Sequence, residues 1–174
     1  ENCTPYPVHR IDKETTGILV VAKNRKYAQL FTSLFRIRKI HKVYLCIVLG
    51  EFKNKKGILE DTLFYYEGSK KIKTKAITHF RVIDSNKGYS LLRLNPITGR
   101  KHQLRKQLLI HGHPVLGDDK YRISLNKNKI KNSLMLHACQ INFTINKMKY
   151  KFIAKTPNIF NQTLNEKYLK NFLQ

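Results

Sequence analysis

The chain has 174 residues, a length that suits one domain with a single core. Its 41% of hydrophobic residues, with nine Tyr and nine Phe, exclude a disordered basic tail, because such tails lack the apolar side chains to form a core. The 34 Lys and Arg outnumber the 11 Asp and Glu and give a formal net charge of +23. An excess this large predicts a polyanionic partner, with nucleic acid first.

The cysteines and the hydropathy of the chain indicate a reduced, non-membrane setting. Cys3, Cys46 and Cys139 are odd in number and widely spaced, so they predict neither a disulfide framework nor a thiolate metal site. The sequence has no apolar run of membrane-spanning length and no signal segment. We therefore expect a cytoplasmic protein that is not bound to a membrane.

The first half of the chain predicts a strand, a helix and a second strand. The apolar run 18–22 is typical of a strand, and Asn24 is a suitable N-cap for a helix after it. An apolar stripe at helical spacing is expected to face the core; it consists of Tyr27, Leu30, Phe31 and Leu34. Residues 43–49, ended by Gly50, are β-branched and aromatic, which predicts a strand with Tyr44 near its beginning.

The middle of the chain predicts a hairpin followed by a helix. Residues 58–66 are apolar but interrupted by Glu60 and Asp61, and they indicate no clear element. Strands at 73–83 and 89–94 are expected to pair across the turn 86–88. A helix is predicted at 102–110, with Leu104 and Leu108 in the core and with His102 and Arg105 on another face, directed away from it.

The last part predicts a second hairpin and a terminal helix. Residues 134–145 and 149–154 are strand-like around the turn Asn146-Lys147, and a helix is expected at 164–173 after Pro157. Strands outnumber helices and are joined mostly by short turns. The expected fold class is therefore α+β, a mixed and largely antiparallel sheet flanked by helices, in one domain over residues 1–174.

Three sequence motifs carry candidate chemistry. His9-Arg10-Ile11-Asp12 opens a loop that ends at Gly17, which places a carboxylate between basic residues, although Asp near Thr and Gly is also common turn chemistry. Lys42-Val43-Tyr44 follows, and then Thr98-Gly99-Arg100-Lys101-His102-Gln103-Leu104-Arg105. Together, in this order and at these separations, the HRxD, KxY and TGRxHQxR patterns resemble the RluA family of pseudouridine synthases, from His9 through Pro157.

The resemblance implies isomerisation of specific uridines in structured RNA, without metal or cofactor. Large-subunit (23S) ribosomal RNA is the first expected substrate and transfer RNA the second. Asp12 matches the family's essential aspartate, which acts as nucleophile or as base for the 2′ proton of the sugar. Tyr44 is expected to act as base at C5 or to stack on the uracil. Arg105 is expected to be the partner that lowers the pKa of the Asp12 carboxyl.

The resemblance also assigns an RNA-binding set. Arg10 resembles the arginine that fills the space left by the extruded uridine. Phosphate or backbone contacts are expected from Lys42, Arg100, Lys101, His102 and Gln103, and residues 114–121 are expected to support the site from behind. Full-length relatives carry more catalytic domain before the aspartate motif and often an S4-type RNA-binding domain, and we expect this chain to lack both.

Other functions fit the sequence less well. A catalytically inactive RNA-binding or ribosome-assembly factor would not need Asp12, Tyr44 and Arg105 together. The sequence has no helix-turn-helix or zinc-finger spacing for a DNA-binding domain, and it lacks the clustered carboxylates of a metal-dependent nuclease. The histidines around His111-Gly112-His113 lack H-E-x-x-H spacing, so no metal site is expected. No obligate protein partner is indicated.

Overall fold

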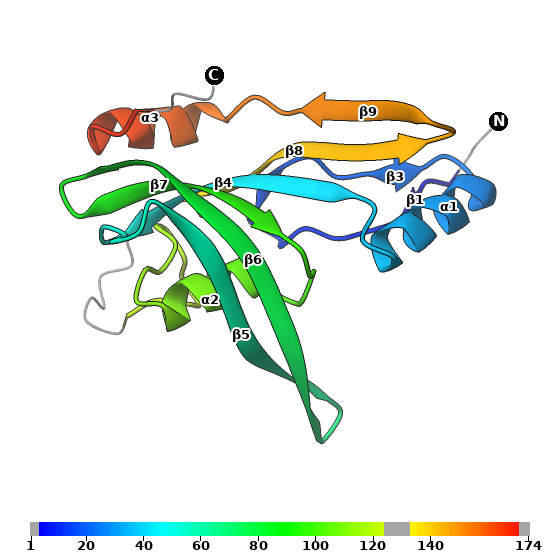
Figure 1. Ribbon diagram of the computed structural model, residues 1–174, viewed down its shortest axis with the longest axis horizontal. Coiled ribbons are helices and arrows are strands. Elements are labelled where there is room, and N and C mark those ends of the chain that lie inside the picture. Colours follow the sequence, from blue (N-terminus) through cyan, green and yellow to red (C-terminus); the bar gives the residue numbers. More distant parts are fainter. Residues whose placement is uncertain (1–3, 124–132, 171–174) are drawn as a thin grey trace.

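The computed structural model describes residues 4–123 and 133–170, and it contains a seven-stranded mixed sheet (Figure 1). The strand order is β2 (Thr16–Gly17), β8 (Leu136–Ile145), β4 (His41–Leu49), β7 (Tyr89–Pro96), β6 (Lys70–Asn86) and β5 (Lys56–Glu67), with β9 (Met148–Ile153) also paired to β8. Only β2 and β8 run parallel. A separate antiparallel pair joins β1 (Tyr6–Pro7) to β3 (Val21–Ala22). The predicted α+β class is confirmed.

Helices cover both faces of the centre of this sheet. In Figure 1, α2 (Gln103–Ile110) and α3 (Asn158–Glu166) lie on opposite sides of the strands. Leu104 and Leu108 of α2 pack in one buried cluster, while Phe160 and Leu164 of α3 pack in another. Strand β4 contributes to both clusters, which explains why its residues 46–48 are all fully buried rather than alternating.

Helix α1 (Arg25–Arg36) begins as predicted but is less buried than expected. The Asn24 side chain accepts a hydrogen bond from the backbone N–H of Tyr27, which caps the helix. Phe31 and Leu34 pack against a small cluster around Phe143, but no residue of the helix is fully buried and Tyr27 is 50% exposed. The expectation that the whole stripe lies in the core was therefore wrong, because α1 lies beside one end of the sheet and not across its centre (Figure 1).

The hairpins follow the sequence closely. Two-residue turns at Lys87-Gly88 and Asn146-Lys147 have positive φ at both positions, the conformation whose twist matches paired strands. Strand β6 extends beyond its predicted range of 73–83, and β5, for which the sequence indicated no clear element, pairs with it along its whole length. The hairpin of β5 and β6 extends beyond the rest of the molecule (Figure 1). The acid Asp61, which obscured β5 in the sequence, faces α2 and accepts a hydrogen bond from Gln107.

Two predicted elements differ from the structure. The run 18–22 forms no continuous strand; Thr16–Gly17 pairs with β8, and Val21–Ala22 pairs with β1. The last helix is α3 at Asn158–Glu166 and not 164–173; residues 171–173 of the predicted range lie outside the described residues. It begins directly after Pro157, since Phe160 and Leu164, one turn apart, are the residues that bury against the sheet.

Candidate active site

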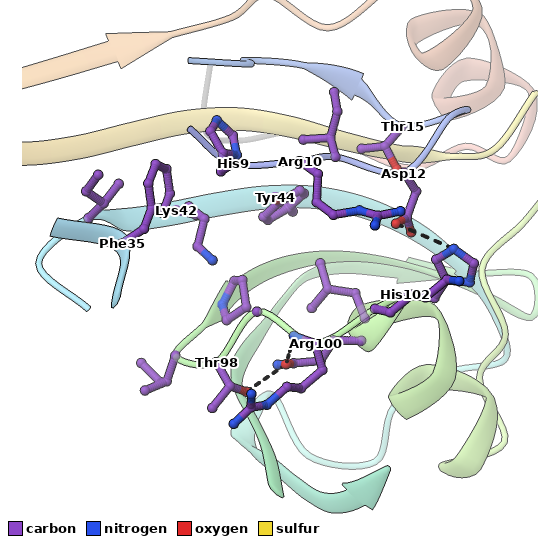
Figure 2. A pocket seen from close by; sticks show the side chains of 18 of the residues that line it. His9, Arg10, Asp12, Thr15, Phe35, Lys42, Tyr44, Thr98, Arg100 and His102 are labelled. Carbon is purple, nitrogen blue, oxygen red and sulfur yellow. Dashed lines mark hydrogen bonds and ion pairs between the residues drawn. The ribbon is translucent and has the colours of Figure 1, made fainter. Parts of the chain in front are cut away.

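A cavity of about 790 Å³ lies where the opening segment, strand β4 and the loop from β7 to α2 meet. Figure 2 shows Asp12 and Arg10 on one side, Tyr44 and Lys42 between, and Arg100 and His102 on the other. Eight of the nine sequence-predicted site residues line this cavity: Arg10, Asp12, Lys42, Tyr44, Arg100, Lys101, His102 and Gln103. The ninth, Arg105, does not line the cavity but contacts Asp12, which does. Residues separated by more than 90 positions therefore come together as predicted.

The loop that carries Asp12 is fixed at its C-terminal end by strand β8. The backbone N–H of Thr15 donates to the carbonyl of Asp12 at 2.9 Å, and Thr16 donates to Nδ1 of the buried His137 at 2.8 Å. Gly17 has a φ of 106°, and a Cβ there would lie 2.2 Å from the carbonyl oxygen of Ala138. Only glycine permits this close approach of the two backbones, so Gly17 fixes the position of the loop.

His9 fixes the other end of the same segment. Its Nε2 accepts a hydrogen bond from the backbone N–H of Val20 at 2.8 Å, and its ring stacks on Phe35 with centroids 4.6 Å apart. Burial, together with the nearby Lys42 ammonium, lowers the pKa of His9 to about 4. His9 is therefore neutral at physiological pH, which leaves Nε2 free to accept that hydrogen bond.

Each carboxylate oxygen of Asp12 faces a different basic side chain. Oδ1 lies 3.8 Å from Nε2 of His102, and Oδ2 lies 3.7 Å from Nη1 of Arg105 (Figure 2 marks the first contact). The Asp12 side chain is 17% exposed, so it reaches the cavity while most of its surface is covered. The two contacts restrict rotation of the carboxylate and leave its cavity side open to a substrate.

Arg105 differs from its prediction in direction and in principal partner. It is 6% exposed, and it forms a bidentate ion pair with the buried Asp118, with Nε–Oδ2 at 2.6 Å and Nη2–Oδ1 at 2.7 Å. The hydrogen bonding of Arg105 to the Asp118 carboxylate is the main reason that the pKa of Arg105 is raised. The expectation that Arg105 points away from the core was wrong, because a buried carboxylate from the segment after α2 compensates its charge.

Tyr44 reaches the cavity from the fourth position of β4. The pairing of β4 with β8 shifts register between Val43 and Tyr44, and such an irregularity redirects the side chain that follows it. Burial, with the negative charge of Asp12 as the next cause, raises the pKa of Tyr44 to about 12. At neutral pH Tyr44 is therefore a phenol with its proton in place.

The loop from β7 to α2 is organised by Gln103. Its Oε1 accepts hydrogen bonds from Thr98 at 2.7 Å and from the backbone N–H of Arg100 at 3.0 Å, while Nε2 donates to Thr78 and to the carbonyl of Ile77. Gln103 is 4% exposed, and these bonds occupy its amide. Its direct contact is therefore with the loop, which it shapes so that Arg100 and Lys101 are exposed at the cavity rim.

The remaining predicted RNA contacts have separate environments. Burial lowers the pKa of Lys42, and its ammonium lies beside Gly99, with Nζ 3.5 Å from where a Cβ would be. Arg100 donates through Nε to the carbonyl of Lys75 at 3.3 Å. Within residues 4–123 and 133–170, no group of three or more His, Cys, Asp or Glu is placed to hold a metal ion, and no helix is long and apolar enough to cross a membrane.

Three residues of the site received no individual contact from the sequence. Asp118 and Tyr121 lie in the turn-rich segment 114–121, which the resemblance placed behind the site without giving either residue a partner. Thr15 lines the cavity with a buried hydroxyl that has no hydrogen-bond partner in the described part of the chain. The resemblance of residues 114–121 to the family pattern placed the segment, but neither it nor sequence distance reveals the buried pair of Arg105 and Asp118.

Comparison with known proteins agrees with this geometry. The sequence profile of the RNA pseudouridylate synthase family matches residues 1–109, and the chain belongs to this family. Within this family, the fold and the three sequence motifs place the chain with the RluA type.

The particular relatives are bacterial. The chain is 36% identical, over 92% of its length, to ribosomal large subunit pseudouridine synthase D of Borreliella burgdorferi (strain ATCC 35210 / DSM 4680 / CIP 102532 / B31). It is 35% identical, over 79% of its length, to ribosomal large subunit pseudouridine synthase C of Vibrio vulnificus (strain CMCP6). These matches cover 51% and 46% of the two relatives, so the chain spans about half the length of each.

A solved structure gives the same family. The human RNA pseudouridylate synthase domain containing 4 superposes with a TM-score of 0.84 at 27% identity, over 96% of this chain and 77% of that one.

Proposed function

We propose that this chain isomerises uridine to pseudouridine in RNA, with Asp12 as the essential carboxylate. The observation that carries the proposal is the convergence of Asp12, Tyr44 and the basic side chains of Lys42, Arg100 and Lys101 on one cavity. The relatives named for large-subunit ribosomal RNA make that RNA the first candidate substrate. A tRNA pseudouridine synthase C of Haemophilus ducreyi (strain 35000HP / ATCC 700724), 33% identical over 80% of this chain, makes transfer RNA the second.

The reaction moves one bond and one proton. The glycosidic bond between N1 and C1′ breaks, the uracil turns in place, and a bond forms between C5 and C1′. The proton on C5 is lost and N1 gains one, so the product is an isomer and no electrons or groups are exchanged. Asp12 initiates the reaction either as nucleophile at C1′ or as base for the 2′ proton. Arg105 and His102 hold the carboxylate in orientation for either role.

Tyr44 and Thr15 contact the extruded nucleotide. The pKa of about 12 for Tyr44 favours stacking on the uracil, or donating a hydrogen bond to it, over acting as the resting base. The unbonded hydroxyl of Thr15, three residues after Asp12, is suited to bond a polar atom of the same nucleotide.

Arg10 and the basic rim hold the RNA outside the cavity. Extrusion of a base costs a few kcal/mol, and Arg10 offsets part of that cost by occupying the vacated space. Lys42, Arg100 and Lys101 contact the flanking phosphates, for which their place at the cavity is suited.

The test is an Asp12→Asn substitution in the complete protein, assayed by mass-spectrometric detection of pseudouridine in transcribed large-subunit ribosomal RNA. Turnover should become undetectable while the RNA Kd changes less than about threefold, because binding is distributed over many basic residues. Glu14→Gln is the matched control, since Glu14 is an exposed acid of the same loop and does not line the cavity.

Undiminished turnover in the Asp12→Asn protein would remove this mechanism. If the unmodified protein binds the RNA tightly but forms no pseudouridine on ribosomal or transfer RNA, the inactive RNA-binding factor is the better description.

A further inference from the structure

A hydrogen bond between Tyr121 and His102 lies directly behind the Asp12 carboxylate. The Tyr121 hydroxyl and His102 Nδ1 are 2.8 Å apart, and the other ring nitrogen, Nε2, is the atom that faces Asp12 at 3.8 Å. None of the three sequence motifs contains Tyr121. Tyr121 therefore contacts one ring nitrogen of His102 while Asp12 faces the other.

Two tautomers of neutral His102 are compatible with the 2.8 Å contact, but only one suits the carboxylate. If Nδ1 donates to Tyr121, the lone pair of Nε2 faces the negative Oδ1 of Asp12. If Tyr121 donates to Nδ1, Nε2 carries the proton and its N–H faces the carboxylate. The second arrangement is favourable, and the first places two electron-rich atoms opposite each other.

Burial and the surrounding charges keep the His102 ring neutral. Burial lowers its pKa, and the positive charges of Arg105, Lys120 and Lys101 act in the same direction, against the opposing effect of Asp12. Burial also raises the pKa of Tyr121, so its hydroxyl retains the proton that it donates. The neutral ring carries one proton. When the Tyr121 hydroxyl donates to Nδ1, that ring proton is on Nε2.

Tyr121 is itself fixed by the same anchor that fixes Arg105. The backbone N–H groups of Lys120 and Tyr121 both donate to Asp118 Oδ1 at 2.9 Å, and the Arg105 guanidinium lies 5.1 Å from the centre of the Tyr121 ring. His102 has a φ of 54°, and its side chain makes no capping bond to α2, so its ring is available for Tyr121 and Asp12. Asp118 thus supports both groups that face the Asp12 carboxylate.

We propose that Tyr121 is a positioning residue that holds His102 as the Nε2–H tautomer, so that an N–H dipole is presented to Asp12. The inference rests on the proposed function, because the consequence for turnover requires Asp12 to be the reacting group. It gives His102 a role toward the carboxylate in addition to the predicted contact with RNA.

The first test measures the tautomer without RNA. In ¹⁵N NMR spectra of the complete, ¹⁵N-histidine-labelled protein at neutral pH, the resonances of His102, assigned by their absence from a His102→Gln protein, should show a protonated Nε2 and an unprotonated Nδ1. Tyr121→Phe removes the hydroxyl but keeps the ring beside Arg105, and it should shift the Nδ1 resonance and mix the tautomers. Tyr150→Phe, in β9 and outside the cavity, should leave His102 unchanged. A protonated Nδ1 in the parent protein, or a His102 spectrum that Tyr121→Phe does not alter, would overturn the proposal.

The second test measures turnover. Tyr121→Phe should lower kcat about tenfold, the loss expected for one oriented hydrogen bond, with KM for RNA within about twofold and an unchanged Tm. A kcat equal to that of Tyr150→Phe would overturn the positioning role even if the tautomer changes. If the parent protein makes no pseudouridine, the proposed function fails, and with it the consequence for turnover, whereas the NMR result still decides the tautomer.

Discussion

Arg105 faces the carboxylates of Asp118, Asp12 and Asp119 at unequal distances, and the nearest determines its role. Asp118 binds it through two hydrogen bonds of 2.6 and 2.7 Å, whereas Asp12 is 3.7 Å away. A guanidinium held by Asp118 is restrained from moving toward Asp12, so the longer contact orients the Asp12 carboxylate without forming a close pair. Asp12 thereby keeps a free side for substrate.

Asp118→Asn should destabilise the protein by about 3 kcal/mol, because it leaves the Arg105 charge buried without its compensating carboxylate. The measurement is the free energy of unfolding from urea denaturation at neutral pH. Asp119→Asn is the matched control. Its side chain is 76% exposed and lies 3.9 Å from Arg105, so the change should stay within about 0.5 kcal/mol. Equal small losses in the two variants would show that the buried pair contributes little.

For individual residues, the sequence predicted which side chains belong to the site better than it predicted which of them contact one another. The motifs that contain Asp12, Tyr44 and His102 could be recognised along the chain, and all three residues line one cavity. The pairing of Arg105 with Asp118 could not be predicted, since it depends on how the segment after α2 folds back. The amide of Gln103 also appears free in the sequence, and only the arrangement of Thr98 and Thr78 around it shows that it is occupied.

The two short hairpins of the sheet use the same turn conformation with different residues. Lys87-Gly88 joins β6 to β7 with glycine at the second position, whereas Asn146-Lys147 joins β8 to β9 with Lys147 at a φ of 65°. A side chain in the left-handed region is strained, and glycine is not. The second turn is therefore less favourable than the first.

Lys147→Gly should stabilise the protein by about 0.5–1 kcal/mol, because Asn-Gly suits this turn better than Asn-Lys. Thermal and urea unfolding measure the change. Lys149→Gly, two positions later in β9, is the control for lost charge and should instead destabilise, since glycine weakens a strand. A loss of stability in the Lys147→Gly protein would contradict the assigned turn.

Elements that depend on neighbours in sequence were predicted well, and those that depend on distant partners were not. The hairpin of β6 and β7 and the beginning of α1 follow from local alternation and a capping residue. The short strand β2 exists only because β8 lies beside it, and α3 is placed by the burial of Phe160 and Leu164. Propensity within a short window contains no information about such partners.

The charge of the whole molecule should give the proposed RNA interaction a strong dependence on salt. With a formal net charge of +23 and several basic side chains at the cavity, we expect about six phosphate contacts. Affinity should then fall on the order of a thousandfold between about 50 and 200 mM salt. Fluorescence anisotropy with a labelled ribosomal RNA fragment measures this slope.

Lys101→Gln should reduce the magnitude of the salt slope by about one, because it removes one phosphate contact, and Asp12→Asn should leave it unchanged. An affinity that does not vary with salt would contradict the polyanion interpretation and would show that the charge excess is not used for binding.

The pairing of β2 with β8 also constrains the order in which parts of the protein can fold during synthesis. Thr16 and His137, which form a hydrogen bond, are 121 residues apart in the chain, and the N–H of Ile18 donates to Ala138. The loop that carries Asp12 is synthesised early, yet the strand that holds it is synthesised on the order of ten seconds later at typical translation rates. Formation of this contact must also offset a large loop-closure entropy, which favours local hairpins as the first structure. Asp12 therefore reaches its position only after most of the sheet has formed. For the proposed function, this means that basic residues of the nascent chain are exposed to RNA before the site that would act on it is complete.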